Sequence, residues 1–477
     1  MGGGSLKAIQ LLAHLRRQGL ASDLRTLLRA DSVAAIAAAI DEPGADVPIA
    51  PAGMPGGPVA MTPMQHWFLR SHDRDLAHLN HQFLLETTLR LDIEAVAAAV
   101  AAVWRRHEAL RLRFSQRDGQ WMATLAPEAA AARPRDVDLR RERDPWVALL
   151  ADAEDRRIAF DLGSGPLFRA VRYRLPEGDA LLLDAHHLVV DAVSWLFLLE
   201  DLLPALGLAG AGPAAFPPGG ELPFSAWTAR LGGWSHGEAL EEERPYWREI
   251  AETPVPPLPT DHPARPHGYA DTAILSVDLG AHAASLPDAR IVAGLLDALA
   301  TALHAWDGRE QSRVQLSTHG RRSPFPGVDP SRTVGWLASE FPVLLACPGG
   351  GAGAAAEIEA QLATVPSAGL GWGALRWLAP RPVEAPEEEI GLNFLGVVDP
   401  VLAGDFHFSQ RLPAASVGAM ERRRLIEIEG SIAEGRLGLA VRYAPSIHER
   451  ATIEALARGI VRAFAGEMPR GADRNER

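Results

Sequence analysis

The spacing of apolar residues along the chain switches repeatedly between two and about 3.6, which predicts a mixed α/β protein. Residues 79–91 are predicted as a strand, and in residues 93–107 the apolar side chains share one helical face. A second strand and a second helix are predicted at residues 180–185 and 193–203. We therefore expect strands and helices to alternate through the first half of the chain.

The second half of the chain shows the same alternation. Its longest helical pattern consists of apolar residues at steps of four, Ile291, Leu295, Leu299 and Leu303. Strands are predicted around residues 314–317 and 426–444, and a terminal helix near residues 452–464. A second group of strands and helices thus follows the first.

Clusters of Pro and Gly interrupt these patterns at residues 41–58 and 207–223. Before the first cluster, residues 5–40 are predicted to form two short amphipathic helices. The predicted division of the chain is an N-terminal appendage at 1–40, a linker at 41–58, an N-terminal lobe at 59–215, a C-terminal lobe at 216–466 and a polar tail at 467–477.

The composition narrows the classes of function. The chain has 477 residues, 47% of them hydrophobic, and a formal net charge of -13. This charge leaves no basic surplus for binding nucleic acid. The sequence has no apolar run of about eighteen residues, and its first residues lack the pattern of a signal peptide. We expect a cytoplasmic protein with neither nucleic acid nor a membrane as its partner.

Two residue types are scarce, and their scarcity excludes particular kinds of chemistry. Lys7 is the only lysine, so no core lysine is available to carry a pyridoxal phosphate Schiff base. Cys347 is the only cysteine, which excludes an intramolecular disulfide, a multi-cysteine zinc site and a racemase with paired thiols. Any inversion of a stereocentre by this chain must use histidine, carboxylate or hydroxyl groups.

The candidate catalytic motif lies where an apolar strand ends. Residues 180–185 lead into His186 and His187, and Asp191 follows at the predicted start of a helix. A histidine held at such a rigid position can accept and return a proton near neutral pH. The alternative interpretation is that both histidines are core residues with satisfied hydrogen bonds. Asp191 either anchors the loop or orients a histidine.

The segment from His186 to Trp195, HHLVVDAVSW, resembles the signature of the condensation-domain superfamily of nonribosomal peptide synthetases. Within it, Val193-Ser194-Trp195 resembles the epimerization branch. Further segments resemble epimerization domains in the same order along the chain: MTPMQHWF at 61–68, DPSRTVGW at 329–336, EFPV at 340–343, PSAGLGWG at 366–373 as a glycine-rich loop, and LNFLG at 392–396. The resemblance extends over nearly all of residues 61–464.

This resemblance implies two lobes, each similar to chloramphenicol acetyltransferase, arranged as a V around a tunnel that His187 lines. It implies an isomerase that inverts the α-carbon of an aminoacyl or peptidyl thioester, with His187 as the working histidine and Asp191 as a mainly structural residue. Asn393 is expected among the polar groups that stabilise an enolate-like intermediate. No catalytic cofactor is needed, because the thioester itself makes the α-proton acidic. The implied partners are a peptidyl carrier domain, which holds the substrate on 4'-phosphopantetheine, and a downstream condensation domain.

The N-terminal segment GGGSLKAIQ, residues 2–10, resembles the phosphopantetheine attachment motif of a carrier domain, with Ser5 as the modified hydroxyl. The alternative is a glycine-rich start in which Ser5 caps a helix. Together with the two helices predicted after it, the segment is similar to the C-terminal half of a carrier domain. We therefore expect the chain to be part of a larger synthetase.

One position departs from the epimerization pattern. The family has Glu-Gly-His-Gly-Arg facing the active histidine, whereas this chain has Ser317-Thr318-His319-Gly320-Arg321. Inversion requires a proton to leave one face of the α-carbon and another to arrive at the opposite face, and serine alone is not a general base. Either His319, a water or another acidic residue replaces the glutamate, or the domain no longer epimerizes. In the latter case it serves as a carrier docking platform or in another acyl-thioester reaction.

Overall fold

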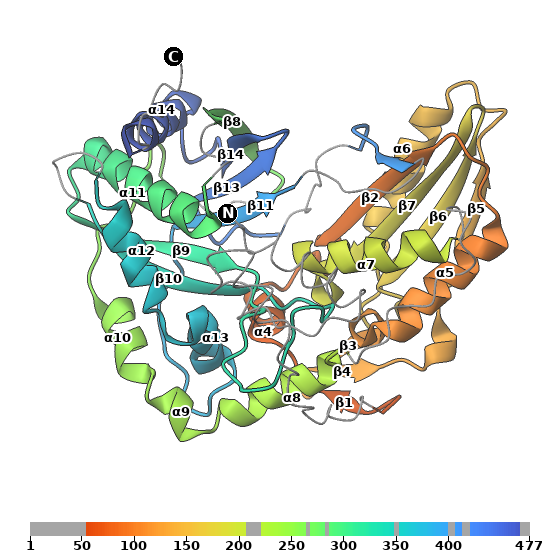
Figure 1. The fold of residues 1–477 in the computed structure, drawn as a ribbon, viewed down its shortest axis with the longest axis horizontal. Coiled ribbons are helices and arrows are strands. Elements are labelled where there is room, and N and C mark those ends of the chain that lie inside the picture. The colour runs from red at the N-terminus through yellow and green to blue at the C-terminus, as the bar shows by residue number, and fades with distance from the viewer. Residues whose placement is uncertain are drawn as a thin grey trace, which may run out of the picture.

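The computed structural model describes residues 54–206, 221–263, 268–281, 286–347, 353–398, 406–412 and 420–467. These residues form two lobes that diverge as a V, each built on a β-sheet with helices packed against it (Figure 1). The predicted α/β class is confirmed. The predicted appendage at 1–40, with Ser5, lies outside the described residues, as do most of the predicted linker and most of the predicted tail.

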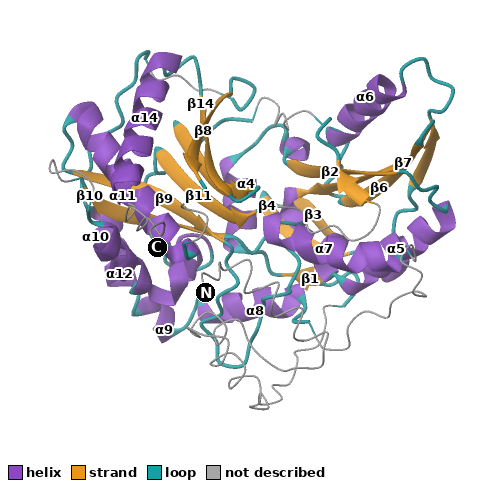
Figure 2. Cartoon of the chain, turned by 45° about the horizontal axis from the view of Figure 1, so that its top comes forward, coloured by secondary structure: helices purple, strands orange, loops and turns teal. Residues whose placement is uncertain are grey.

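The first lobe contains a five-stranded sheet in the order β12-β2-β7-β6-β5. Its strands are β2 (Asn80–Thr87), β5 (Arg135–Asp138), β6 (Phe168–Leu175), β7 (Gly178–His186) and β12 (Phe406–Phe408). Its helices are α5 (Ile93–Arg106), α6 (Pro145–Arg157) and α7 (Ala192–Ala205). Helices α5 and α7 cover one face of the sheet and α6 covers the other (Figure 2).

Strand β7 lies in the centre of this sheet, and all of its residues are buried. Leu181 and Leu183 pack in the core shared with α5 and α7, whereas Leu182 packs in the core shared with α6. A strand covered on both faces is mostly apolar. This double burial explains the apolar run from Ala180 to Leu183, and the buried Asp184 that follows is paired with Arg169.

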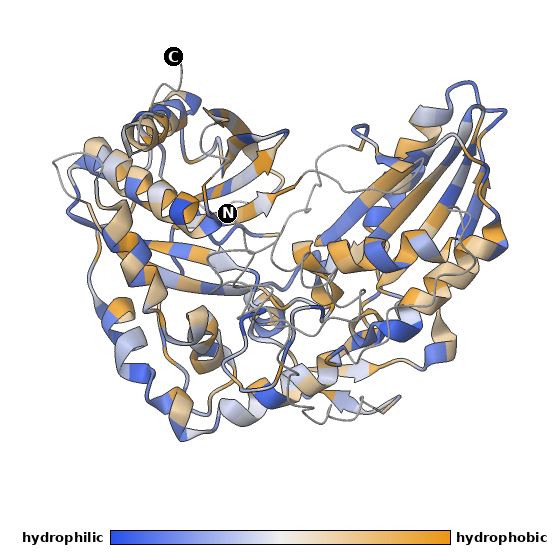
Figure 3. Cartoon of the chain, viewed as in Figure 1, coloured by the Kyte–Doolittle hydropathy of each residue, from blue (hydrophilic) through white to orange (hydrophobic). Residues whose placement is uncertain are grey.

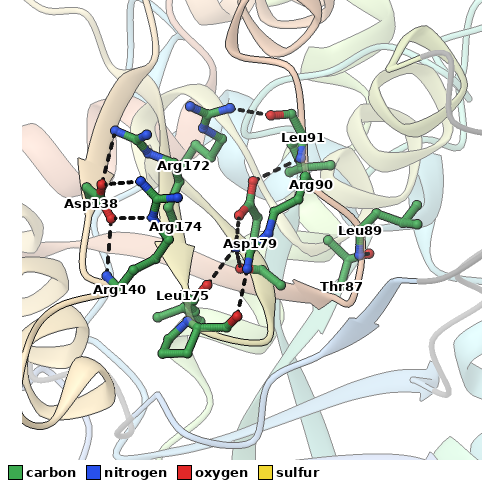
Figure 4. A network of polar contacts seen from close by, with 12 residues as sticks. Thr87, Leu89, Arg90, Leu91, Asp138, Arg140, Arg172, Arg174, Leu175 and Asp179 are labelled. Atoms are coloured by element: carbon green, nitrogen blue, oxygen red, sulfur yellow. Dashed lines mark hydrogen bonds and ion pairs between the residues drawn. The ribbon is translucent and has the colours of Figure 1, made fainter.

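A network of ion pairs holds the end of β7 that lies opposite His186 (Figure 4). The Asp179 carboxylate accepts hydrogen bonds from the backbone N–H of Leu91 and from the Arg90 guanidinium, both at 2.9 Å. Arg172 on β6 donates to the carbonyl of Leu91. These contacts attach the segment between β2 and α5 to the neighbouring strands, so the central strand is anchored at its start.

The second lobe contains a six-stranded sheet in the order β10-β9-β11-β13-β14-β8. Its strands are β8 (Ala273–Gly280), β9 (Gln311–Thr318), β10 (Ser339–Ala346), β11 (Ile390–Val397), β13 (Ile426–Ala433) and β14 (Arg436–Tyr443). Its helices are α11 (Asp288–Asp307), α12 (Ala355–Ala363) and α14 (Arg450–Glu467). The predicted strand at 426–444 is thus a hairpin, which turns at Glu434 and Gly435, both with positive φ.

One face of the second sheet is apolar and the other is partly polar, as the alternating colours along its strands indicate (Figure 3). Val314 and Leu316 of β9 belong to the core formed with α11 and α14. Gln315 and Ser317 alternate with them and therefore point to the opposite face. This polar face is the one that looks toward the first lobe.

Further elements lie outside these two sheets. They are β1 (Pro58–Val59), α4 (Pro63–Ser71), β3 (Leu112–Arg117), β4 (Gln120–Leu125), α8 (Phe224–Trp234), α9 (Glu238–Glu241), α10 (Arg244–Glu252) and α13 (Leu370–Trp377). Strands β1, β4 and β3 form a small sheet of their own. Helices α8 and α9 run along the lower edge of the molecule, and α10 continues up the outer side of the second lobe (Figure 1). Among the helices that the structure describes, none is long and apolar enough to span a membrane.

Two segments of the second half of the chain pack with the first lobe. Strand β12 pairs with β2, with Phe406 opposite Thr87. Val334 and Trp336, which lie between β9 and β10, belong to the same core as Phe68 of α4. Both segments cross the predicted division at residues 215 and 216, so the lobes are interlocked.

The predicted glycine-rich loop at residues 366–373 is corrected by the structure. It begins with a single turn at Pro366–Gly369 and continues directly into α13. A Cβ atom on Gly371 would lie 1.8 Å from a carboxylate oxygen of Glu243. The glycine therefore allows a helix to pack closely against its neighbour, which periodicity of apolar residues does not reveal.

Candidate active site

A cavity of about 1470 Å³ lies between the two lobes. His81 and His187 line it from the first lobe, and Ser317, Glu340 and Asn393 line it from the second. A cavity of this size accommodates a long, flexible substrate chain. Within the described part of the chain, no group of three or more His, Cys, Asp or Glu side chains is arranged to hold a metal ion.

The two adjacent histidines of the motif have different environments. The ring of His186 is fully buried, with Nε2 2.6 Å from the carbonyl of Leu76 and Nδ1 3.1 Å from the N–H of Leu188. The first contact requires Nε2 to donate and the second requires Nδ1 to accept, which is the neutral tautomer. Burial lowers the pKa of His186 to about 3. His186 is therefore a satisfied core residue.

His187 instead reaches the cavity. Its backbone N–H donates to the carbonyl of Leu79 at 2.8 Å, which fixes the turn after β7 to the start of β2. Its ring lies between those of His81 and Trp336. The ring centroids of His187 and His81 are 4.3 Å apart, with their planes inclined at 68°, and those of His187 and Trp336 are 4.2 Å apart. Burial lowers the pKa of His187, and the negative charges of Asp191 and Glu340 oppose this shift. The result is an oriented imidazole that is available to a molecule in the cavity.

His81 is a cavity residue that sequence analysis missed. It lies on β2 opposite Ala185 of β7, so strand pairing brings it beside His187. Its Nδ1 accepts a hydrogen bond from the indole N–H of Trp195 at 3.0 Å. Burial lowers the pKa of His81 well below its usual value, so the ring is neutral at neutral pH. Recognising that β2 pairs with β7 would have identified His81 as a neighbour of the histidine motif.

Asp191 joins the first lobe to the Arg321 segment. It caps α7 by accepting from both the N–H and the hydroxyl of Ser194 at 2.8 Å. The guanidinium of Arg321 binds the same carboxylate through two nitrogens at 2.8 and 2.9 Å, and the N–H of Leu337 donates at 3.0 Å. Burial alone would raise the pKa of Asp191, but Arg321 and Ser194 bring it below its usual value. These contacts favour the anchoring role over the orientation of a histidine.

His319 also lines the cavity but is uncharged at neutral pH. Its Nδ1 accepts a hydrogen bond from the N–H of Arg321 at 3.0 Å. Burial, together with the positive charges of Arg321 and Arg322, lowers the pKa of His319 to about 3. A base this weak is poorly suited to remove a proton from carbon.

A row of polar residues crosses the sheet of the second lobe. Glu340 on β10 is opposite Ser317 on β9, Ser317 is opposite Asn393 on β11, and Asn393 is opposite Glu429 on β13. Residues opposite one another in a sheet point to the same face. All four line the cavity. Of this row, sequence analysis identified Ser317 and Asn393 but missed both carboxylates.

Comparisons with known proteins agree with this architecture. The family described as "Condensation domain" matches residues 57–466. A linear gramicidin synthase of Brevibacillus parabrevis is 31% identical over 495 residues, which cover 97% of this chain and 6% of that protein. Surfactin synthase subunit 2 of Bacillus subtilis (strain 168) is 29% identical over 474 residues, 95% of this chain and 13% of that protein. The chain thus spans only a small part of the length of these relatives.

Solved structures show the same fold. The epimerization domain from the third module of tyrocidine synthetase B superposes with a TM-score of 0.79 at 27% identity, covering 88% of this chain and 98% of that one. The X-domain from teicoplanin biosynthesis superposes with a TM-score of 0.70 at 19% identity, covering 88% of this chain and 97% of that one, a likeness of fold alone. With a family match over most of its length and a histidine motif on the cavity wall, this chain belongs to the condensation-domain family.

Proposed function

We propose that this domain inverts the α-carbon of an aminoacyl or peptidyl thioester that a carrier domain presents on 4'-phosphopantetheine. The observation that carries the proposal is the position of His187, on the cavity wall and across from the polar row of the second lobe. The likeness to an epimerization domain of tyrocidine synthetase B supports it. The domain is then an isomerase that uses no catalytic cofactor.

The chemistry follows from the positions of the side chains. A thioester carbonyl acidifies the α-proton, and neutral His187, held between two rings, can accept that proton. The negative charge moves to the carbonyl oxygen, where a hydrogen-bond donor stabilises it. Asn393 lines the same cavity, and we assign its side-chain amide to this oxygen. Asp191, which follows the His187 turn at the start of α7, and Arg321, which binds its carboxylate, hold this turn in place.

A second candidate function rests on Ser317. The epimerization pattern has a glutamate at this position, and a serine hydroxyl cannot perform the same proton transfer. In this alternative the domain binds a loaded carrier without inverting its substrate, as a docking platform or in another acyl-thioester reaction. Substitution of His187 would then leave the product and its stereochemistry unchanged.

Hydrogen–deuterium exchange tests the proposal. A carrier domain is loaded in turn with each standard L-amino acid as its phosphopantetheine thioester and incubated with the chain in deuterated water. We expect deuterium at the α-carbon and D-product for at least one amino acid, detected by mass spectrometry and chiral chromatography. Neither label nor D-product from any loaded carrier, with a folded domain, would favour the docking function.

The proposal also includes partners and organisation. The partners are the peptidyl carrier domain that bears the substrate and a downstream condensation domain that accepts the inverted product. The appendage at 1–40, with Ser5 as a phosphopantetheine attachment site, and the two lobes divided near residue 215 remain part of this proposal. We place the synthetase in the cytoplasm.

A further inference from the structure

We propose that Glu340 is the second proton-transfer group of this domain and works from the wall opposite His187. The inference rests on the epimerase function proposed above and deepens it. It assigns to β10 a carboxylate that the epimerization pattern places on β9.

The position of Glu340 is the first observation. In the antiparallel pair of β9 and β10, Glu340 is directly opposite Ser317. The two side chains therefore share the cavity face of the sheet, and the Ser317 hydroxyl donates to a carboxylate oxygen of Glu340 at 3.0 Å. A carboxylate thus occupies the neighbourhood of position 317 although residue 317 itself has none.

The contacts of Glu340 hold its carboxylate in one orientation. Arg424 donates to its second carboxylate oxygen at 2.6 Å, and the side-chain amide of Gln315 donates to the same oxygen. The Arg424 side chain is only 10% exposed and also donates to Gln315 at 2.7 Å. A carboxylate that receives several charge-assisted hydrogen bonds has a fixed geometry, as proton transfer to carbon requires.

The carboxylate also faces the same space as His187. Both residues line the cavity, one from each lobe. A continuous set of rings connects their surroundings: His187 contacts Trp336, Trp336 lies 6.4 Å from Trp67, and the Arg424 guanidinium lies 5.9 Å from the Trp67 ring. Burial lowers the pKa of His187, and the negative charge of Glu340 is among the effects that partly oppose this shift. Two titratable groups thus face one substrate from opposed walls.

The same geometry accounts for the serine at position 317. A glutamate there would place a second carboxylate directly across the strand pair from Glu340, and like charges in that arrangement are destabilising. One of the two would then hold a proton. The small hydroxyl of Ser317 avoids this repulsion and supplies Glu340 with a hydrogen bond instead.

Inversion of the α-carbon requires that His187 and Glu340 together carry one transferable proton at the start. With His187 protonated and Glu340 ionised, Glu340 takes the α-proton: the C–H bond breaks, an O–H bond forms, and the electron pair moves onto the thioester oxygen. His187 then gives its proton to the opposite face of the carbon, and the electron pair returns to form the new C–H bond. The pair ends as neutral His187 and protonated Glu340, which is the starting state for the other stereoisomer. No oxidant, reductant or co-reactant is needed.

The experiment compares Glu340→Gln and His187→Ala on both stereoisomers of a carrier-bound aminoacyl thioester that the wild-type chain inverts. Inversion and α-deuterium exchange are measured separately in deuterated water. We expect each variant to lose inversion by about 100-fold or more. Each variant should still exchange the α-proton of one stereoisomer only. The two variants should differ in which stereoisomer they exchange, because Glu340→Gln retains His187 and His187→Ala retains Glu340, on opposite faces of the α-carbon.

Two further variants separate position from stability. Ser317→Glu combined with Glu340→Gln returns the carboxylate to β9, and we expect it to recover inversion relative to Glu340→Gln alone. Asp278→Asn is the matched control, since Asp278 is an exposed carboxylate paired with Arg436 on the edge strand of the same sheet. It should invert at the wild-type rate. Thermal unfolding of all variants confirms that each is folded.

The outcomes distinguish this inference from the proposed function. If the folded Glu340→Gln variant inverts both stereoisomers at the wild-type rate, Glu340 has no part in proton transfer while the epimerase function stands. If both variants keep exchange with the same stereoisomer, the two groups do not act on opposite faces. If the wild-type chain neither exchanges nor inverts any loaded carrier, the proposed function itself fails.

Discussion

The two walls of the cavity are built in different ways. On the wall of the first lobe, the motif that carries His187 is one continuous segment, in which β7 ends at His186, a single turn carries His187, and Asp191 caps α7. The wall of the second lobe comes from strands far apart in the chain, with Ser317 on β9 and Glu340 on β10 brought together by register. The spacing of His187 and Asp191 is set within one segment of the chain, whereas the spacing of Ser317 and Glu340 is set by strand pairing.

This difference determines whether the reactive group of each wall can lie at a neighbouring position in the sequence or sheet. A continuous turn fixed by backbone contacts leaves little freedom to move His187, because its N–H already binds the carbonyl of Leu79. In a sheet, a side chain on the neighbouring strand reaches nearly the same space, since opposite Cβ atoms lie about 5 Å apart. A carboxylate on either β9 or β10 can therefore serve the second wall, whereas no neighbouring position can replace the histidine of the first. The predictions below test this contrast.

The largest effect is expected for the first wall. Substitution of His187 by Ala should lower the rate of inversion by about 10²–10⁴-fold, the range for loss of a general acid or base. The rate is measured by chiral analysis of the product released from the carrier. His407→Ala is the control, because His407 is a largely exposed histidine on β12. Equal losses of inversion rate in the two variants would show that His187 takes no part in the reaction.

The next effect concerns the contact between the walls. Asp191→Asn leaves the buried guanidinium of Arg321 without its charge partner and should lower the free energy of unfolding by about 3–5 kcal/mol. Urea denaturation measures this loss. Asp92→Asn is the control, because Asp92 caps α5 through an exposed hydrogen bond and Asn caps equally well. A loss no larger than that of the control would show that the ion pair does not hold the lobes together.

A smaller effect is expected for the group assigned to the oxyanion. Asn393→Ala should lower inversion by about 100-fold, because it removes one hydrogen-bond donor from the developing negative charge. Unlike loss of His187 or Glu340, it should slow exchange of both stereoisomers equally. Exchange measured separately for the L- and D-thioesters reveals the difference. A loss confined to one stereoisomer would place Asn393 on a face of the α-carbon instead.

The smallest effect concerns stability and pH. His186 of the first wall and His319 of the second both have a pKa lowered to about 3, mainly by burial. The unfolded chain takes up their protons near pH 6.5, so the stability present above that pH is lost as pH falls toward 3. Each such histidine contributes a slope of about 1.4 kcal/mol per pH unit. Urea denaturation between pH 4 and pH 7 should show a shallower slope for His319→Asn; an unchanged slope would mean that His319 is not buried as a neutral ring.

Sequence reasoning predicted much of the architecture because the elements are locally encoded. The helix predicted at 93–107 is α5, and the helix predicted at 193–203 is α7. The predicted strand at 426–444 is a hairpin, since its apolar alternation continues past a two-residue turn. The prediction of a loop at 366–373 is wrong for residues 370–373, which begin α13, because glycines that serve close packing are also compatible with a helix.

The sequence by itself determined the α/β class, the family and the segment that carries His187, because a motif within one strand and turn keeps its spacing in the folded chain. Only the tertiary structure decided that His186 is buried while His187 faces the cavity, that His81 lies beside it, and that Glu340 lies opposite Ser317. The physical reason is that such contacts depend on which strands pair and in which register. A one-residue change in register would turn each of these side chains to the other face.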